Sequence, residues 1–418
     1  MNCYLFKNIK TCLTLQNVLK KNGKYLVADD LSLKNNISIY CEGDTIKWIG
    51  SYKDFKPKLI DPIIEIDCIN KLVAPGLIDC HTHMLFGGNR SHEYSMRLNG
   101  FSYQEIADLA KKNNALSGIN YTAHKTLEFL ENEIEILNLL YHRIERAINQ
   151  GITTLEVKTG YALTQEGEIQ SARILAKCKK IFSHRINIVV TFMPAHSIPI
   201  DFSSSEQYWC DVIKPASILV AQEGIIDLMD IFIEQGYFDT SFLKKMQILS
   251  EELRVPWRAH VDEFCDLNGA MLASELGAKS CDHLLYSNSD GAKALEKNNT
   301  VGVLLPGTAF FLGKKLANGK MFVDAGVKVA IASDYNPGSC YYSNLLQIAK
   351  MSAMTFQFNA AQIWSAVTFN AAHALNLQDR GVIKEGYKAH FSIFECESFE
   401  EILYDWDQNY KISTYLCQ

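Results

Sequence analysis

Residues 73–83 read Val-Ala-Pro-Gly-Leu-Ile-Asp-Cys-His-Thr-His, and the fold expected for the chain follows from this stretch. Its first seven residues form a short apolar run that is typical of a buried β-strand. His81 and His83 come almost directly after that strand. Because side chains two positions apart on an extended segment point the same way, both imidazoles can reach one metal ion. Taken alone, the pair is explained equally well as two unrelated surface histidines.

Similar apolar runs recur along the chain. Short apolar runs alternate with longer segments whose apolar residues have helical spacing, such as residues 127–149. Further strands are expected at residues 153–158, 186–192, 228–233, 257–260, 280–283, 301–305 and 327–333. About eight strand–helix repeats predict an α/β fold, a parallel (β/α)8 barrel of the TIM type.

Both ends of the chain look rich in strands. Residues 37–40 and 45–50 alternate apolar and polar side chains around Gly43-Asp44, which predicts a hairpin. Residues 391–394 are a strand candidate that follows a turn at 381–386. We therefore expect a small β-sandwich domain made from residues 1–72 and 373–418, beside a barrel domain made from residues 73–372.

The composition fits a soluble globular protein. The 418 residues are 48% hydrophobic and 21% charged, and the formal net charge of −6 argues against a general nucleic-acid or membrane binder. The first residues lack the pattern of a signal peptide, and no apolar run reaches the length of about 18 residues that spans a bilayer. The twelve cysteines include no Cys-x-x-Cys pair, which indicates reduced thiols and a cytoplasmic location.

Two further strand ends carry residues that could bind a metal ion. His260 ends the strand expected at 257–260, and Asp334 directly follows the strand expected at 327–333. Barrel enzymes assemble their active sites at the carboxyl ends of the strands. Imidazole nitrogens with a carboxylate suit zinc or iron(II) with an open position for water. His260 could instead be a core histidine and Asp334 a turn residue, but their joint placement with the histidine pair favours a metal site.

Two more histidines lie at strand ends. His283 ends the strand expected at 280–283, and His196 follows the strand expected at 186–192. A structural histidine held by hydrogen bonds is a common alternative for each. The positions at strand ends favour substrate contact or proton transfer.

Five stretches carry a resemblance to a known family. They are His81–Arg90 (His-Thr-His-Met-Leu-Phe-Gly-Gly-Asn-Arg), Glu156–Tyr161, Thr191–His196, Leu304–Thr308 and Ser333–Ser339 (Ser-Asp-Tyr-Asn-Pro-Gly-Ser). Together with Pro75–His83, they resemble the amidohydrolase superfamily and, within it, the imidazolonepropionase family. The His-Thr-His start is shared by many hydrolases and deaminases, whereas the Gly-Gly-x-Arg and Asp-Tyr-Asn-Pro-Gly-Ser stretches are much more specific.

The resemblance implies an activity and a cofactor. The activity is hydrolysis of a small molecule, 4-imidazolone-5-propanoate, to N-formimidoyl-L-glutamate in histidine degradation, by a metal-activated water that attacks the cyclic amide carbonyl. One divalent metal ion per chain, zinc or iron, is expected, bound by His81, His83, His260 and Asp334. Asp334, Glu263 and His283 are expected to transfer protons. The resemblance also implies a homodimer.

The substrate of that reaction carries a carboxylate. Arg90 offers a planar, bidentate partner for it, and its place in the Gly-Gly-x-Arg loop outweighs the usual explanation of an arginine as a solvated surface residue. His196 is expected to stabilise the developing oxyanion. The other expected substrate contacts are Tyr103, Tyr161, Glu263, Asn336, Gly338 and Ser339, the last three on a turn whose backbone N–H groups suit a carboxylate.

Some features depart from the family or leave alternatives open. Residues 114–122 replace the glycine-rich loop that the family usually has, so substrate contacts there are open. Lys158 lies near the position where some amidohydrolases carry a carboxylated lysine between two metal ions. We expect an unmodified lysine here, and a two-metal site is the less favoured alternative. An aminohydrolase of purines or pyrimidines is the nearest rival, but it would not need Arg90. A non-catalytic barrel is disfavoured because all four ligands are present.

Overall fold

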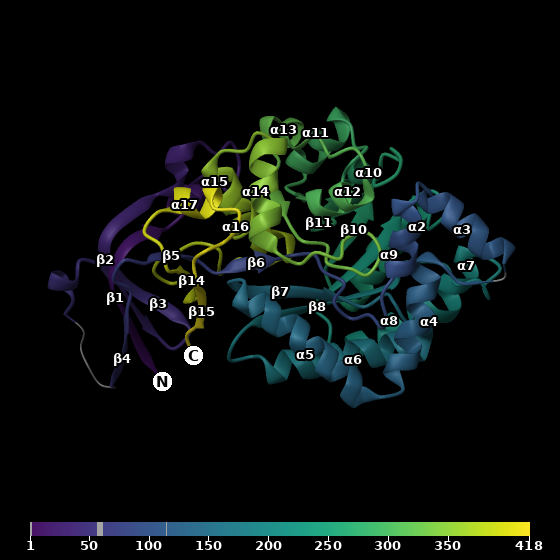
Figure 1. The fold of residues 1–418 in the computed structure, drawn as a ribbon, viewed down its shortest axis with the longest axis horizontal. Coiled ribbons are helices and arrows are strands. Elements are labelled where there is room, and N and C mark those ends of the chain that lie inside the picture. The colour runs from purple at the N-terminus through teal and green to yellow at the C-terminus, as the bar shows by residue number, and fades with distance from the viewer. Residues whose placement is uncertain (1, 57–61, 114) are drawn as a thin grey trace.

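The chain folds into a parallel barrel beside a separate sheet that both chain ends build (Figure 1). A computed structural model describes residues 2–56, 62–113 and 115–418. The barrel strands, in their order around the sheet, are β6 (Leu77–Asp79), β7 (Ile152–Lys158), β8 (Asn187–Ala195), β9 (Leu228–Ile233), β10 (Trp257–Val261), β11 (Ser280–His283), β12 (Val301–Leu304) and β13 (Val329–Ile331).

The eight strands form a nearly closed barrel. Each pairs in parallel with the next, and a parallel bridge between Thr82 and Tyr335 joins the segments that follow β6 and β13. Every residue of β7, β9 and β10 is buried, as expected for parallel strands that are covered on both faces. The predicted (β/α)8 fold is therefore confirmed.

Helices follow the strands and cover the barrel. They are α5 (Glu133–Asn149), α6 (Gln165–Ile181), α7 (Ser205–Tyr208), α8 (Lys214–Gln222), α9 (Ser241–Leu253), α10 (Gly269–Glu275), α11 (Ser289–Lys297), α12 (Pro306–Leu312), α13 (Gly319–Asp324), α14 (Leu345–Thr355), α15 (Ala360–Ala366) and α16 (Phe369–Ala374), with a π-helix, η3 (Trp209–Ile213). Three more lie between β6 and β7: α2 (Ser91–Leu98), α3 (Tyr103–Lys112) and α4 (Gly118–Leu130). Among the described residues, no helix has the length and hydrophobicity needed to cross a membrane.

The helical spacing over residues 127–149 belongs to two helices. The segment contains the end of α4 and all of α5, because Asn132 interrupts it as an N-cap whose side chain accepts the N–H of Glu135. A side chain that satisfies the first free N–H groups of a helix fixes where that helix begins.

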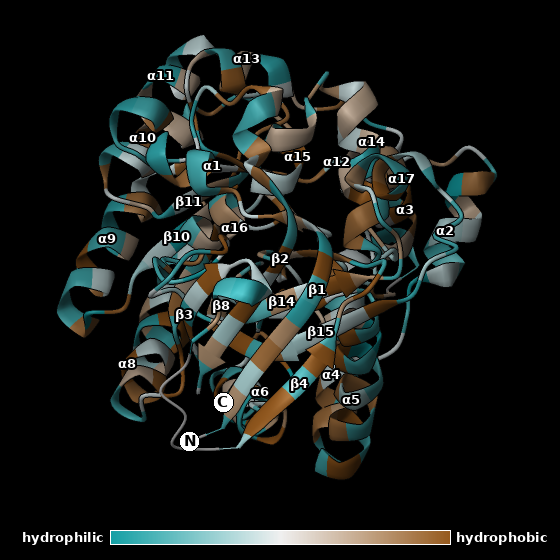
Figure 2. Cartoon of the chain, turned by 90° about the vertical axis from the view of Figure 1, so that its left-hand side faces the viewer, coloured by the Kyte–Doolittle hydropathy of each residue, from teal (hydrophilic) through white to brown (hydrophobic). Residues whose placement is uncertain are grey.

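The second sheet joins both chain ends. Its strands are β1 (Cys3–Leu13), β2 (Leu33–Glu42), β3 (Thr45–Gly50), β4 (Ile63–Asp67), β5 (Leu72–Pro75), β14 (His390–Phe394) and β15 (Ile412–Leu416); α1 (Gln16–Lys20), α17 (Phe399–Tyr404) and the 3₁₀-helices η1 (Ala28–Leu31) and η2 (Tyr52–Asp54) flank it. The predicted hairpin is the antiparallel pair β2–β3. Phe6, Ile39 and Phe391 belong to a buried cluster of this sheet's own. Figure 2 looks onto the sheet and shows both termini close together.

The strand predicted over residues 73–79 is divided between the two sheets. β5 belongs to the second sheet and β6 to the barrel, and Gly76 lies between them. A Cβ atom on Gly76 would lie 2.0 Å from Oγ1 of Thr153, so only glycine fits where the chain crosses to the barrel. This close approach is a tertiary contact, which the apolar run does not reveal.

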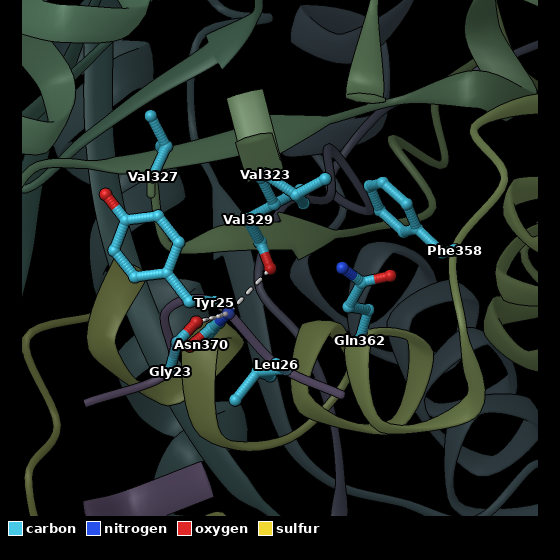
Figure 3. Close-up of a pocket in the computed structure, with 9 residues that line it drawn as sticks. All are labelled: Gly23, Tyr25, Leu26, Val323, Val327, Val329, Phe358, Gln362 and Asn370. Atoms are coloured by element: carbon cyan, nitrogen blue, oxygen red, sulfur yellow. Dashed lines mark hydrogen bonds between the residues drawn. The ribbon is translucent and has the colours of Figure 1, made fainter. Parts of the chain in front are cut away.

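A small cavity of about 10 Å³ marks the seam between the N-terminal segment and the barrel (Figure 3). Beside it, Nδ2 of Asn370 donates to the carbonyl oxygens of Gly23, at 3.2 Å, and Val329, at 2.9 Å. Val329 begins β13, so the cavity lies at the amino end of that strand. Barrel active sites form at the opposite, carboxyl ends, and the bonds of Asn370 here hold the N-terminal segment in place.

Candidate active site

Four candidate metal ligands converge at the carboxyl ends of β6, β10 and β13. Nε2 of His81 lies 3.5 Å from Oδ1 of Asp334, and Nε2 of His83 lies 3.6 Å from the same oxygen. Nε2 of His260 lies 3.4 Å from Nε2 of His83. All four side chains are buried. The structure therefore brings together the residues that the sequence placed at three separate strand ends.

This donor set fits a divalent cation. Within the described residues, Nε2 of His81 is buried without a hydrogen-bond partner, and two imidazole nitrogens face each other. Burial lowers the pKa of His81 and of His83 well below the usual value, which leaves neutral rings with lone pairs. Ligand atoms of His81, His83 and His260 lie within 4.8 Å of one another, and so do those of His81, His283 and Asp334. Imidazole nitrogens with a carboxylate oxygen suit zinc or iron.

Two buried carboxylates orient the ligand rings. Nδ1 of His81 lies 2.5 Å from Oδ2 of Asp282, and Nδ1 of His260 lies 3.1 Å from Oδ1 of Asp230. A carboxylate only accepts, so each Nδ1 carries the proton and each Nε2 presents its lone pair to the centre. Asp230 and Asp282 were not predicted from the sequence, although Asp282 directly precedes His283 at a strand end.

Two buried cations hold these carboxylates. Arg258 donates to Asp282 and to the carbonyl oxygen of Cys80. Nζ of Lys158 lies 2.6 Å from Oε1 of Glu156 and 2.8 Å from Oδ2 of Asp230. Burial raises the pKa of Asp282, and the guanidinium of Arg258 opposes that shift. Lys158 is thus paired as an ammonium group on both sides, which suits an unmodified lysine.

Glu263 and His283 lie next to the proposed ligands. Nδ1 of His283 is 3.6 Å from Oε1 of Glu263, beyond the length of a normal hydrogen bond. Burial, together with the charges of Asp334 and Glu234, raises the pKa of Glu263 well above its usual range. Glu234 accepts the N–H groups of Glu263, at 3.1 Å, and Phe264, at 2.8 Å. Glu234 directly follows β9, a strand-end position that could have singled it out.

His196 is held as a hydrogen-bond acceptor toward the pocket. Its Nδ1 lies 2.9 Å from the carbonyl oxygen of Gly160, so Nδ1 must be the donor. Burial lowers the pKa of His196 to about 3, which keeps the ring neutral and leaves Nε2 unprotonated. A neutral ring in this orientation cannot donate to an oxyanion from Nε2. It can accept an N–H group of a ligand instead.

The turn after β13 is held by hydrogen bonds between its own residues. Oδ1 of Asn336 accepts the N–H groups of Gly338, at 2.9 Å, and Ser339, at 2.7 Å. These backbone donors, which were expected to face a substrate carboxylate, are therefore engaged within the turn. Gly338 has a different part in the site, because a Cβ atom there would lie 2.1 Å from Cζ of Arg90. The missing side chain lets the guanidinium lie against the turn.

These residues surround one pocket of about 600 Å³. Most candidate residues from the sequence line it: His83, Arg90, Tyr161, His196, His260, Glu263, His283, Asp334, Asn336 and Ser339. Other lining residues were not anticipated, among them Phe232, Tyr237, Phe264 and Lys314. Tyr103 begins α3, but its side chain lies outside the described part of the structure, as does Asn114 in the unusual loop.

Comparisons with known proteins agree with this architecture. A model of the amidohydrolase family matches residues 72–417. An imidazolonepropionase of Clostridium tetani is 34% identical over 408 residues, which are 97% of this chain and 94% of the relative. An imidazolonepropionase of Bacillus cytotoxicus is 34% identical over 363 residues, or 86% of this chain and 83% of the relative.

A solved structure shares the fold at low sequence identity. The zinc complex of an atrazine chlorohydrolase from Arthrobacter aurescens superposes with a TM-score of 0.67 at 14% identity, covering 95% of this chain and 88% of the other. At this identity the likeness concerns the fold alone. The site brings candidate metal ligands, further titratable side chains and a buried arginine together in one pocket.

Proposed function

The chain belongs to the imidazolonepropionase family of the amidohydrolases, and on that premise we propose how its pocket hydrolyses 4-imidazolone-5-propanoate to N-formimidoyl-L-glutamate. One observation carries the proposal. Three imidazole nitrogens and the carboxylate of Asp334 converge at one end of a pocket that also contains Arg90. This pairs a hydrolytic centre with a partner for the propanoate group.

His81, His83, His260 and Asp334 would hold one divalent ion, zinc or iron. When bound, such an ion supplies Lewis acidity, which lowers the pKa of water toward neutrality and polarises a carbonyl group. Asp282 and Asp230 keep two of the imidazoles in the tautomer that this requires.

The side chains around the centre move the protons of ring opening. Water adds its oxygen to the amide carbonyl carbon, and Asp334 accepts the proton that this water loses. The bond from that carbon to the ring nitrogen then breaks, and the nitrogen needs a proton. Glu263 or His283, which face each other beside Asp334, delivers it, and the proton that Asp334 accepted then restores the donor, so that no proton is gained or lost in the cycle.

The other pocket residues bind and orient the substrate. Arg90 pairs with the propanoate, and its contact with the Gly338 backbone sets the position of the guanidinium. Nε2 of His196 accepts a ring N–H group, consistent with its bond to Gly160. Tyr161 and Ser339 offer further hydrogen bonds, and Tyr103 remains a candidate. An aminohydrolase of purines or pyrimidines is the weaker alternative, because its substrates give Arg90 no carboxylate to bind.

We also propose that the enzyme is a cytoplasmic homodimer that binds neither nucleic acid nor membrane. The net charge of −6 supports the second point. Exposed aromatic side chains support dimerisation, since a patch of this kind is typical of a protein interface. Phe310, Tyr341, Tyr342 and Trp406 are exposed and line one groove. Sedimentation of the wild type and of a Phe310→Asp variant would test this.

The activity is tested with freshly prepared 4-imidazolone-5-propanoate. The loss of its ultraviolet absorbance is followed with protein loaded with zinc or iron(II), and the product is identified by mass spectrometry. We expect N-formimidoyl-L-glutamate from the wild type and no turnover from Asp334→Ala. An absence of turnover in wild-type protein with one metal ion per chain would overturn the proposal.

A further inference from the structure

Glu93 forms a buried ion pair with the arginine of the pocket. It stands in the first turn of α2, three residues after Arg90, and its Oε2 lies 3.1 Å from Nε of Arg90. Both side chains are only 5% exposed. The contact is made to the Nε edge of the guanidinium. Cζ and both terminal nitrogens of Arg90 lie where a Cβ atom of Gly338 would stand, so the guanidinium packs against that residue.

The second oxygen of Glu93 holds the start of α4. Oε1 accepts the N–H of Gly118, the first residue of that helix, at 2.7 Å. Ser117 is the N-cap residue of α4, but within the described part of the chain its side chain makes no capping hydrogen bond. Glu93 therefore caps α4 from a different helix, and its charge is favourable at a helix N-terminus. One buried carboxylate thus links Arg90 to the beginning of α4.

The start of α4 is also part of the pocket wall. Ile119, next to Gly118, lines the main pocket together with Arg90 and Tyr237. A side cavity of about 140 Å³ lies behind this wall, lined by Glu93, Gly118, Ile119 and Tyr237 among others. Displacement of Glu93 would therefore release both the guanidinium and the wall that separates the two spaces.

We propose that Glu93 is a positioning residue that fixes Arg90 for recognition of the substrate carboxylate and couples it to the start of α4. The inference rests on the proposed function, in which Arg90 binds that carboxylate. Glu93 has no contact with the reacting ring in this account. Its effect reaches substrate through Arg90, and so it concerns binding of the carboxylate more than the chemical step.

The charge of Glu93 has two opposite effects on the binding of a carboxylate at Arg90. A carboxylate beside Arg90 repels an incoming carboxylate, which would make Glu93 a competitor. However, Glu93 holds the Nε edge and shares its charge with the α4 N-terminus, whereas a bidentate ligand uses the terminal nitrogens. A pre-oriented guanidinium also loses less conformational freedom on binding. We expect positioning to be the larger effect.

The experiment compares an acid and an uncharged analogue. Steady-state kinetics with 4-imidazolone-5-propanoate and with its propanamide are measured for the wild type, Glu93→Gln and Arg90→Ala. Glutamine keeps an acceptor for Gly118 but removes the charge. In Glu93→Gln we expect the preference for the acid to fall about tenfold, mainly through KM, and in Arg90→Ala we expect it to vanish. Glu128→Gln, on the exposed face of α4, is the matched control and should keep the wild-type ratio.

Glutarate binding gives a second readout that does not require turnover. Calorimetry should show glutarate binding about tenfold more weakly to Glu93→Gln than to the wild type. The inference is overturned if Glu93→Gln keeps the wild-type acid preference, if it slows both substrates equally, or if it binds glutarate more tightly. The proposed function fails separately, if the wild type hydrolyses neither substrate or if Arg90→Ala still prefers the acid. In that case the glutarate comparison still decides whether Glu93 positions Arg90 for a carboxylate.

Discussion

Removing the negative charge of Asp282 should weaken metal binding although every proposed ligand stays in place. Oδ2 of Asp282 lies 2.5 Å from Nδ1 of His81 and also accepts from Arg258, while Oδ1 accepts the hydroxyl of Ser280 at 2.8 Å. In Asp282→Asn, the amide oxygen can still accept from both partners at the Oδ2 position. The NH2 group then takes the Oδ1 position and faces the Ser280 hydroxyl, which can accept a hydrogen bond as well as donate one. The variant therefore removes the charge and little else.

The expected loss can be worked out from these contacts. Charge-assisted hydrogen bonds are roughly twice as strong as neutral ones, so the difference is about 1–1.5 kcal/mol at the bond to His81. This corresponds to a dissociation constant for zinc or iron(II) that is about tenfold higher. Asp282→Ala removes the bond itself and leaves the tautomer of His81 unspecified. For Asp282→Ala we expect the dissociation constant of the metal ion to rise about a hundredfold, the upper range for loss of a group that orients a metal ligand.

The assay is competition for the metal ion against a chromophoric chelator, with thermal melting of the metal-free protein to establish folding. Asp79→Asn is the control. Asp79 is buried two residues before His81, and its Oδ1 accepts the backbone N–H of Ser333. Burial raises the pKa of Asp79 to about 7, so part of this carboxyl is already neutral at pH 7 and asparagine removes only a fraction of a charge. The reasoning is refuted if Asp282→Asn binds the metal as tightly as the wild type, or if Asp79→Asn loses as much affinity.

Three further variants test other parts of the structure. Gly338→Ala places a methyl group on the Arg90 guanidinium, so KM should rise about tenfold or more while metal content is unchanged; kinetics and metal analysis measure this. Glu234→Gln removes the charge that holds the Glu263 backbone, so kcat should fall about tenfold to a hundredfold with KM nearly constant in the same assay. Burial lowers the pKa of Lys328 to about 8, below the ordinary 10.5, so the folded chain loses this proton before the unfolded chain. The free energy of unfolding of the wild type therefore increases as the pH rises from about 8 to 10.5, because the buried Lys328 becomes neutral. Lys328→Met should raise Tm by about 2–4 °C at pH 7 and by less at pH 10.

Each of these expectations has a distinct contrary result. An unchanged KM in Gly338→Ala would mean that Arg90 can move aside without loss of binding. A Glu234→Gln variant with wild-type kcat would show that the Glu263 loop is held by other contacts. A stabilisation by Lys328→Met that is equal at pH 7 and pH 10 would assign the effect to packing and not to the buried charge.

The barrel could be predicted because its strands are local features of the sequence. The strands predicted at 228–233 and 280–283 coincide with β9 and β11. Parallel strands covered on both faces are continuous apolar runs, and turns delimit them. The predictions were wrong or incomplete where a boundary depended on one polar or tertiary contact. The approach of Thr153 to Gly76 divided the predicted strand, and the N-cap of Asn132 begins a second helix within the helical segment 127–149.

Several residues of the site could be predicted for a similar reason. Residues that directly follow barrel strands must gather at one end of the fold, so His83, His260 and Asp334 could be grouped without coordinates. Glu93, Glu234 and Asp230 act on these groups from other elements. Their residue types do not reveal which group each one contacts, and none of the three was predicted as a site residue, although Glu234 stands directly after β9.

The sequence by itself determined which reactive side chains stand at the ends of the strands, because strand periodicity and the carboxyl-end rule are local. The tertiary structure decided what each group can do. His81 takes its tautomer from Asp282, 201 residues away, and Nε2 of His196 becomes an acceptor because the ring proton stays on Nδ1, which donates to the carbonyl oxygen of Gly160, 36 residues away. Hydrogen-bond direction and burial set the protonation state of a side chain, and both depend on neighbours that only the closed barrel brings together.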